Sequence, residues 1–228
     1  MKLVDLSMPI ETGHFRWPVT RRKAGDFEQG SLFEVTSIAT TCHGFTHMDA
    51  PSHMVPGGDT LDELDLARVV GPAAVIDLSD IGPNEEITDQ HLEAAASHLR
   101  SGEIALFRTC WDEQRDWRGE SYWRDAPWLA ASACKWLLAR QPTAIAFDFP
   151  QDWTIRKILD DEMRPIEEHV SHDILLRNGI TLIEYLVGTV SITDSRVYLC
   201  ALPIHIPGAD GAPARVVALC GEDASELR

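Results

Sequence analysis

The chain has 228 residues, of which 44% are hydrophobic and 25% charged, and its formal net charge is −16. This length and composition are typical of a soluble globular protein with a substantial core, and the acidic surface argues against binding to nucleic acid or anionic membranes. No segment approaches the roughly 18 apolar residues of a membrane span, and the N-terminal stretch becomes polar too early for a signal peptide. Five scattered cysteines without a C-x-x-C pair favour a reduced, cytoplasmic setting.

Strands and helices are predicted to alternate along the first two thirds of the chain. Short runs of β-branched or apolar residues predict four strands, at 32–42, 73–79, 104–109 and 144–149. Apolar residues at helical spacing predict two helices, at 88–99 and 126–141. The alternation from 73 to 149 predicts an α/β unit whose neighbouring strands are parallel.

The last third of the chain is more mixed. Residues 150–170 are charged, and we interpret them as a surface excursion that forms a lid or an oligomerisation arm, or as an ordinary connection. Residues 171–186 predict a short helix, a turn and a strand. Two further strands, at 195–206 and 214–219, flank a loop that contains glycine and proline.

The stretch "CHGFTHMDAPSH" at 42–53 concentrates side chains that can bind metals. The candidate ligands are His43, His47, Asp49 and His53, which are separated by 4, 2 and 4 positions in the sequence. A helix would turn Asp49 away from the two preceding histidines, and the proline within the stretch also argues against a helix. In an extended chain, even separations point side chains to the same face. We therefore predict that all four face a common site.

The span between the first two histidines requires a bend in the chain. Four extended residues cover about 13 Å, which is too far for His43 and His47 to bind one ion at about 2 Å each. We predict the bend at Gly44, because glycine adopts conformations that other residues avoid. Asp49 lies only about 6.6 Å beyond His47 and can share its ion directly. His53 follows the proline that ends the strand, and we expect it beside the ion rather than on it.

The types of ligand point to a catalytic site. Two imidazoles and a carboxylate, without a thiolate, leave one coordination position open, and zinc, manganese or iron would accept this set. A free histidine beside the ion would supply a general acid or base. The alternative is a polar strand face or a group of hydrogen-bonded core side chains, but four groups in phase are unusual in a chain with nine histidines.

The stretch "HGFTHMDAPSH" resembles the H-x-G-T-H-x-D-x-P-x-H signature of the cyclase family of metal-dependent hydrolases, which includes bacterial kynurenine formamidase and isatin hydrolase. Other segments are similar to family segments in the same order: DLSMPI, VGPAAVIDLS, LFRTCWD, ILLRNGITLIE and ALPIHIPGADGAPARVVAL. The resemblance implies one α/β domain over residues 1–228, of the swivelling β/β/α-like cyclase architecture with mixed sheets and flanking helices. It also implies a homodimer or homotetramer.

The resemblance also assigns roles to residues that match family motifs. It implies a catalytic acid/base at His53 and metal ligands at three residues: His43, His47 and Asp49. His172 and Glu184 match downstream ligands that complete a two-metal site in formamidase members, whereas isatin hydrolase-like members are described with one manganese. Trp17 stands where the family carries an aromatic residue that faces the substrate. Of His172, Glu184 and Trp17, only Glu184 indicates a functional role without the resemblance, because a carboxylate in a buried strand needs a partner or an ion.

Three departures from the family pattern bear on the substrate. Phe45 replaces the central glycine of the signature, and Phe149 stands where a small polar residue is expected. The segment 150–170 is longer and more charged than in compact formamidase members, and it carries Trp153.

Together, these observations predict a metal-dependent hydrolase that uses zinc or manganese, with one or two ions per chain. Metal-activated water, with a histidine acid/base, would cleave an amide, formamide or lactam bond of a small aromatic substrate. One alternative is a lactone hydrolase or a cyclase of another pathway. A second is a metal-stabilised binding protein without catalysis.

Overall fold

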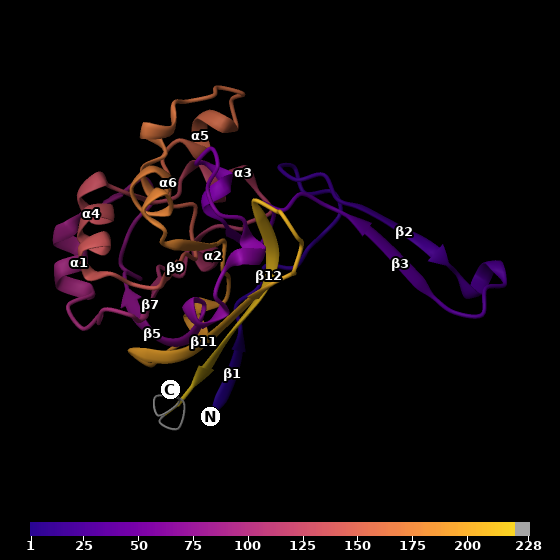
Figure 1. Ribbon diagram of the computed structural model, residues 1–228, viewed down its shortest axis with the longest axis horizontal. Coiled ribbons are helices and arrows are strands. Elements are labelled where there is room, and N and C mark those ends of the chain that lie inside the picture. Colours follow the sequence, from indigo (N-terminus) through magenta and orange to yellow (C-terminus); the bar gives the residue numbers. More distant parts are fainter. Residues whose placement is uncertain (222–228) are drawn as a thin grey trace.

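A mixed eight-stranded sheet forms the centre of the computed structural model, which describes residues 1–221. The strand order is β1-β12-β11-β5-β7-β9-β10-β4, and β4 also pairs with β12, so the sheet curls into a barrel-like arrangement (Figure 1). Two small sheets, β2-β3 and β6-β8, lie outside it. The strands are β1 (Lys2–Asp5), β2 (Thr20–Gly25), β3 (Val35–Ala39), β4 (His47–Asp49), β5 (Val70–Asp77), β6 (Glu86–Ile87), β7 (Ile104–Arg108), β8 (Trp128–Leu129), β9 (Ala144–Ala146), β10 (Thr181–Glu184), β11 (Arg196–Pro203) and β12 (Gly211–Cys220).

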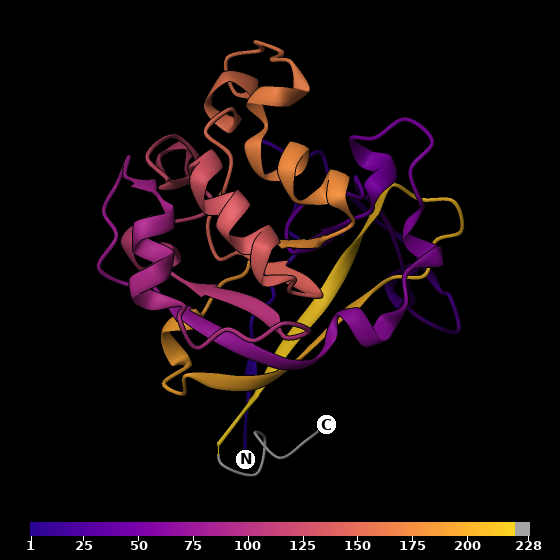
Figure 2. The same ribbon diagram turned by 60° about the vertical axis from the view of Figure 1, so that its left-hand side comes forward.

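The four strands β5, β7, β9 and β10 run parallel, which confirms the predicted α/β unit. Their crossover segments contain α1, α4 and α6, which pack in a row on one side of the sheet (Figure 2). The helices are α1 (Asp89–Ala95), α2 (Trp111–Gln114), α3 (Glu120–Arg124), α4 (Ala131–Arg140), α5 (Ile155–Ile158) and α6 (Val170–Ile174). Among residues 1–221, no helix is long and apolar enough to cross a bilayer.

The parallel strands are buried on both faces, which explains why their sequences are continuous apolar runs. Along β5, Ala74 and Ile76 join the core beneath the helices, whereas Ala73 and Val75 join a second core enclosed by the curled sheet. This alternation follows the pleat of the strand.

Several predicted elements differ in extent from those in the structure: the strand expected over 144–149 ends at Ala146, and the helix expected over 88–99 ends at Ala95. The helix expected over 126–141 begins only at Ala131, because the residues before it form β8, which pairs with β6. The strand expected over 32–42 is limited to β3, which within the described residues pairs only with β2. This hairpin projects from the body of the molecule (Figure 1).

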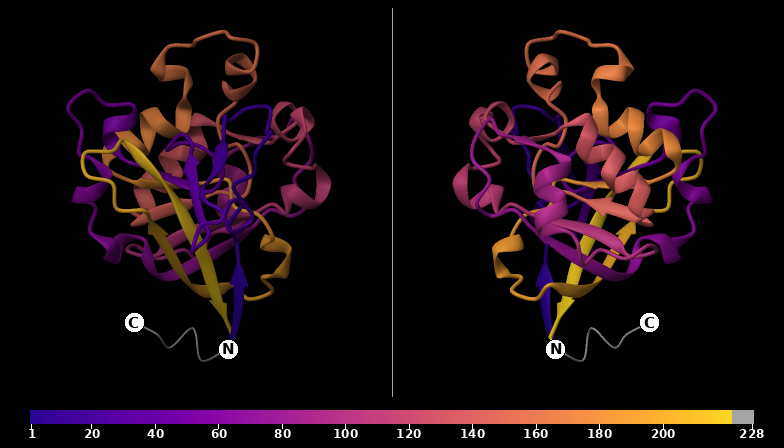
Figure 3. Two further views of the ribbon diagram at one scale, coloured as in Figure 1. Left: turned by 90° about the vertical axis from the view of Figure 1, so that its right-hand side faces the viewer. Right: turned by 90° about the vertical axis from the view of Figure 1, so that its left-hand side faces the viewer.

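The segment 150–170 contains α5 and a single 3₁₀ turn at Ile166–Glu168. It rises above one end of the sheet, as the two opposite views in Figure 3 show. Several of its side chains line the cavity described in the next section.

A buried carboxylate joins the ends of the parallel strands. Asp148, just after β9, accepts hydrogen bonds from the backbone N–H groups of Thr109 and Cys110, each with a shortest distance of 2.8 Å. The hydroxyls of Thr109 and Thr189 donate to the same carboxylate at 2.8 and 2.6 Å. Burial raises the pKa of Asp148 to about 6, although these donors oppose the shift.

We expect Asp148→Asn to lower the free energy of unfolding by about 1–3 kcal/mol at pH 7, because an amide NH₂ group would face donors that lose their acceptor. A folded-state pKa of about 6, above the usual 3.8, means that protonation stabilises the folded chain. The difference from wild type should therefore grow as the pH falls from 7 towards 4. Urea unfolding measures it.

The control is Asp116→Asn, which changes a carboxylate that is 67% exposed. It should alter the free energy of unfolding by less than about 0.5 kcal/mol. Equal effects of the two substitutions would show that the Asp148 hydrogen bonds do not hold the strand ends together.

Candidate metal centre

Strand β4 places two of the predicted ligands in the curl of the sheet. It pairs with β10 on one side and with β12 on the other. His47 is directly opposite Glu184 in the antiparallel register, so both side chains lie on the same face. The His47 Nε2 and Glu184 Oε2 atoms are 3.7 Å apart. Sheet register therefore brings together residues that are 137 positions apart in the sequence.

The bend before β4 falls at Phe45 rather than at the predicted Gly44. Phe45 has a φ of 59° in the left-handed region, whereas Gly44 does not have a positive φ. The Phe45 carbonyl accepts a hydrogen bond from His47 Nδ1 at 2.9 Å, which leaves Nε2 of that ring free for the site. Gly44 is needed for space, since a Cβ there would lie 3.0 Å from a Thr41 methyl and 3.3 Å from Trp17.

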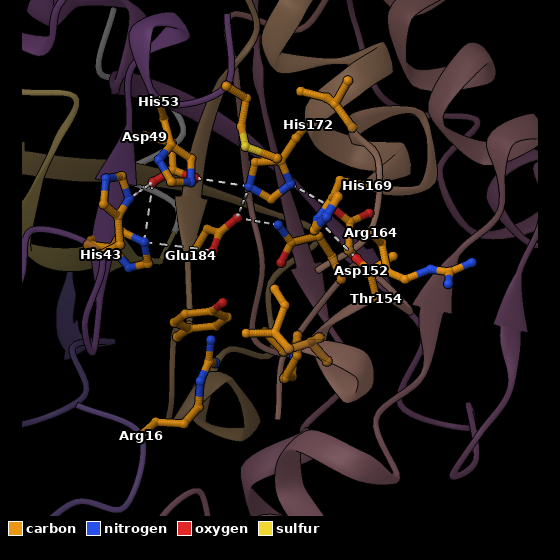
Figure 4. Close-up of a pocket in the computed structure, with 18 of the residues that line it drawn as sticks. Arg16, His43, Asp49, His53, Asp152, Thr154, Arg164, His169, His172 and Glu184 are labelled. Carbon is orange, nitrogen blue, oxygen red and sulfur yellow. Dashed lines mark hydrogen bonds and ion pairs between the residues drawn. The ribbon is translucent and has the colours of Figure 1, made fainter. Parts of the chain in front are cut away.

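The Asp49 carboxylate is the centre of the cluster. Its Oδ1 lies 2.8 Å from His43 Nδ1 and 3.2 Å from His47 Nε2, and its Oδ2 lies 3.2 Å from His172 Nε2 (Figure 4). Burial alone would raise the pKa of Asp49, but the three histidines lower it well below its usual value. The carboxylate is therefore ionised and available as a ligand on both sides.

His172 and Glu184, the two predicted ligands that follow later in the sequence, also lie next to Asp49. His172 Nε2 is 3.4 Å from Glu184 Oε1, and Nδ1 of the same ring lies 2.6 Å from Asp152 Oδ2. A carboxylate on one ring nitrogen fixes the orientation of the ring and aims the other nitrogen at a metal. Gln151 donates a hydrogen bond to Glu184. The structure thus brings His172 and Glu184 to the cluster as the motif match implied.

His53 and His43 are stacked at one edge of the cluster, with ring centroids 3.8 Å apart. Burial lowers the pKa of His53 to about 4. Burial would also lower the pKa of His43, but Asp49 and Asp210 raise it to about 9. The two adjacent imidazoles are therefore in different protonation states at neutral pH, with His53 neutral.

The donor set fits a divalent cation. Two groups have ligand atoms within 4.8 Å of one another, His43–Asp49–His53 and His47–Asp49–Glu184, and Asp49 belongs to both. Burial raises the pKa of Glu184, and the negative charge of Asp49 raises it further, so the two buried carboxylates repel each other. A bound cation would offset this repulsion. Imidazole and carboxylate ligands suit zinc or manganese.

Two residues near His43 were not predicted from the sequence. Asp210 Oδ2 lies 2.9 Å from His43 Nε2 and 3.8 Å from His53 Nδ1. A Cβ on the next residue, Gly211, would lie 2.6 Å from His43 Cε1 and 2.7 Å from the Met48 carbonyl oxygen. The sequence showed only a loop here, and the pairing of β12 with β4 is what brings this loop to the site.

A cavity of about 500 Å³ opens beside the cluster. The segment 150–170 supplies much of its wall, with these side chains: Gln151, Asp152, Thr154, Ile155, Ile158, Met163, Arg164, Ile166 and His169. Trp17 is buried and lines an adjacent cavity, together with His43. Phe149 packs in the core against Phe107 and does not line the cavity.

Comparisons with known proteins identify the family. The family model described as "Putative cyclase" matches residues 4–151, more than half of the chain. This chain belongs to the cyclase family. The predicted membership and the α/β fold are thereby confirmed.

Relatives cover nearly the whole chain. This chain is 29% identical over 218 residues to kynurenine formamidase of Bacillus cereus, a match that covers 94% of this chain and 95% of the relative. It is 28% identical over 224 residues to kynurenine formamidase of Salinibacter ruber, with 95% and 97% covered. The predicted class, a hydrolase of carbon–nitrogen bonds other than peptide bonds, is that of these relatives.

Solved structures share the fold. A predicted metal-dependent hydrolase from Bacillus stearothermophilus matches with a TM-score of 0.73 and 26% identity, over 95% of this chain and 97% of that one. Isatin hydrolase A from Labrenzia aggregata matches with a TM-score of 0.77 and 22% identity, over 95% of this chain and 93% of that one.

We expect Gly211→Ala to weaken metal binding by at least about tenfold, because the added methyl group would displace the His43 ring from its place against β12. Metal content after dialysis, measured by elemental analysis, checks this outcome. Gly71→Ala is the matched control, since a Cβ there meets nothing within 4 Å. If both variants retain the metal content of the wild type, the tight contact at Gly211 does not set the position of His43.

Proposed function

We propose that this protein is a metal-dependent hydrolase that cleaves the amide, formamide or lactam bond of a small aromatic substrate. The observation that carries the proposal is the position of Asp49. This one carboxylate lies between His43 and His47 on one side and His172 on the other, beside a cavity of about 500 Å³. The kynurenine formamidase and isatin hydrolase relatives support the choice of bond.

In this proposal, the metal ligands are His43, His47, Asp49, His172 and Glu184. They would hold one or two zinc or manganese ions, and the two Asp49 oxygens, which lie toward His43 and His47 on one side and toward His172 on the other, favour two. When bound, a divalent ion lowers the pKa of water from about 15.7 towards 7 and polarises a carbonyl oxygen. Asp152 and Gln151 hold His172 and Glu184 in place for this task.

His53 is the proposed acid/base. Because its pKa is lowered to about 4 by burial, its imidazole is neutral near pH 7 and can accept a proton from water. Water adds to the carbonyl carbon, the carbon–nitrogen bond breaks, and His53 returns the proton to the leaving nitrogen. The negative charge of Asp210, whose Oδ2 is 3.8 Å from His53 Nδ1, would stabilise the charged form of the ring.

The segment 150–170 is proposed as the lid side of the cavity rather than as an oligomerisation arm, because its side chains line the cavity. Trp17 would contact an aromatic substrate only from the adjacent cavity that it lines with His43. The scattered free cysteines support a cytoplasmic location.

The proposal is tested by metal analysis of the purified protein, combined with a hydrolysis screen over N-formylkynurenine, isatin and simple lactones. Turnover of the formamide or the lactam supports it. Turnover of lactones alone indicates the lactone hydrolase alternative. A metal that raises the melting temperature without turnover of any substrate indicates a binding protein.

We expect His53→Ala to lower kcat by about 10²–10⁴-fold, because the proton acceptor is lost, while the metal content stays that of the wild type. His205→Ala, which removes an exposed histidine, is the control. Full activity in the His53 variant would remove this residue from the mechanism, and loss of metal would make it a ligand.

We propose that the projecting β2–β3 hairpin is the oligomerisation arm, with a second copy of this chain as its partner. Five large apolar side chains on it are exposed: Phe27, Leu32, Phe33, Val35 and Ile38. An apolar surface of this kind is typical of a contact between proteins. This hairpin would join the chains into the expected homodimer or homotetramer.

Replacing Leu32 and Phe33 by glutamate is expected to give a monomer by light scattering, where the wild type gives a dimer or tetramer, because buried charges would disrupt an apolar interface. Replacing the exposed Met163, which lies outside the hairpin, by glutamate is the control. An oligomer that survives the double substitution would exclude the hairpin as the contact.

A further inference from the structure

Arg16 lines the same cavity as the metal cluster (Figure 4). Within residues 1–221, no carboxylate forms an ion pair with it. The other arginine in the cavity wall, Arg164, differs, because it forms a two-pronged pair with Glu168 at 2.8 and 2.9 Å. The charge of Arg16 is thus the one arginine charge in the described cavity wall that no side chain neutralises.

The Arg16 guanidinium is held in place by aromatic side chains. Its central carbon lies 4.3 Å from the ring centre of Trp123, 5.1 Å from that of Trp17 and 5.8 Å from that of Tyr185. It also lies close enough to the Tyr185 hydroxyl to lower its pKa, which burial raises. The Nη1 atom is buried and has no hydrogen-bond partner among the described residues. Ring faces and a neutral hydroxyl fix the position of the group but do not neutralise its charge.

A purely structural role would make Arg16 similar to the other arginines that stack on tryptophans. Arg118 lies 4.0 Å from the Trp117 ring centre and also pairs with Glu11 at 2.8 and 2.6 Å. Arg140, stacked on a tryptophan at 4.4 Å, pairs with a glutamate at 3.1 Å. Arg115, 5.5 Å from a tryptophan ring centre, pairs with an aspartate at 3.1 Å. Arg156, 5.1 Å from the Trp128 ring centre, has no carboxylate partner, but its guanidinium donates to the Ala126 carbonyl and to Asn84 Oδ1. Arg16 differs from all four, because its buried Nη1 atom has no partner among the described residues and the group faces a cavity.

The backbone places Arg16 and the metal cluster around one volume. Tyr185 directly follows the ligand Glu184, and its φ of 59° turns the chain at the end of β10. The Tyr185 ring contacts both the cluster and Arg16, because its centre lies 5.3 Å from that of the ligand His47 and 5.8 Å from the central carbon of the Arg16 guanidinium. Figure 4 shows Arg16 at the opposite end of the cavity from His53 and Asp49. Apolar side chains of the segment 150–170, among them Ile155 and Ile158, also line this cavity. A ligand can therefore reach the cluster at one end and the guanidinium at the other, with an apolar body between them.

We propose that Arg16 binds a carboxylate of the substrate. A guanidinium presents two parallel donors that match a carboxylate. On the basis of the proposed function, the preferred substrate is an aryl amide or formamide that carries a carboxylate on a short side chain, distant from the bond that is cleaved. Arg16 is a specificity residue in this scheme and takes no part in proton transfer.

The first test compares two synthetic substrates that differ only in charge, 3-(2-formamidophenyl)propanoate and its primary amide. Metal-loaded wild type should prefer the carboxylate by at least about tenfold in kcat/KM, mainly through KM, as expected for a charged hydrogen-bonded contact. In Arg16→Met the ratio should fall towards one, and Arg16→Lys should recover part of it. Arg118→Met, which removes a stacked arginine outside the cavity, should keep the wild-type ratio.

Equal kcat/KM values of wild type for the two substrates would overturn the inference without any variant. An unchanged ratio in Arg16→Met, with wild-type folding by circular dichroism, would overturn it as well. Both results leave the proposed hydrolase function intact, because the formamide bond is still cleaved.

The second test does not depend on catalysis. Calorimetry on metal-free protein measures binding of 3-phenylpropanoate and of its primary amide. Wild type should bind the carboxylate more tightly than the amide, and Arg16→Met should lose this difference. If neither formamide is hydrolysed but this difference is found, the proposed function fails and the carboxylate site stands. If wild type shows no difference in binding, the carboxylate site fails.

Discussion

The buried carboxylate of Asp49 is the constraint on which the rest of the site depends. It lies on a three-residue strand that pairs on both sides, with β10 and with β12. Burying a carboxylate is costly unless cations or hydrogen-bond donors surround it. Those neighbours are three histidines, His43, His47 and His172. The double pairing of β4 holds Asp49 among them, opposite Leu182 of β10 on one side and Gly211 of β12 on the other. The pairing that closes the sheet through β4 therefore also assembles the metal centre.

The residues that contact the ligand histidines also help to build the site. Asp152 fixes His172, Asp210 contacts His43, and the Phe45 carbonyl fixes His47. Each contact engages one ring nitrogen of a histidine and leaves the ring oriented toward Asp49. Polar groups around ligands of this kind tune metal affinity by setting the orientation and basicity of the imidazoles. Contacts within the protein thus orient the ligand side chains.

Phe45 contacts both the metal centre, through its carbonyl oxygen and His47, and the aromatic side chains of Trp17 and Trp117. A left-handed conformation costs a non-glycine residue about 1–2 kcal/mol, and burial of the whole side chain offsets this cost. The ring packs 4.7 Å from Trp17, which in turn lies beneath Arg16. The aromatic ring that replaces the glycine of the family signature thus lies in the core behind Trp17, which lines the adjacent cavity, and does not line that cavity itself.

Local spacing in the sequence predicted that His43, His47, Asp49 and His53 meet at one site, because side-chain direction in an extended chain depends on the count of residues, and the structure places them together. The alternation of apolar runs predicted the parallel α/β unit. His172 and Glu184 were implied only by the match to family motifs. Local spacing could not locate the bend, since the backbone conformation at Phe45 is stabilised by packing against residues distant in sequence, such as Trp17 and Trp117. The sequence also did not predict that Asp210 and Gly211 lie at the site. They reach the site only because β12 pairs with β4 across more than 160 positions, and the register of such long-range pairing is decided by tertiary structure.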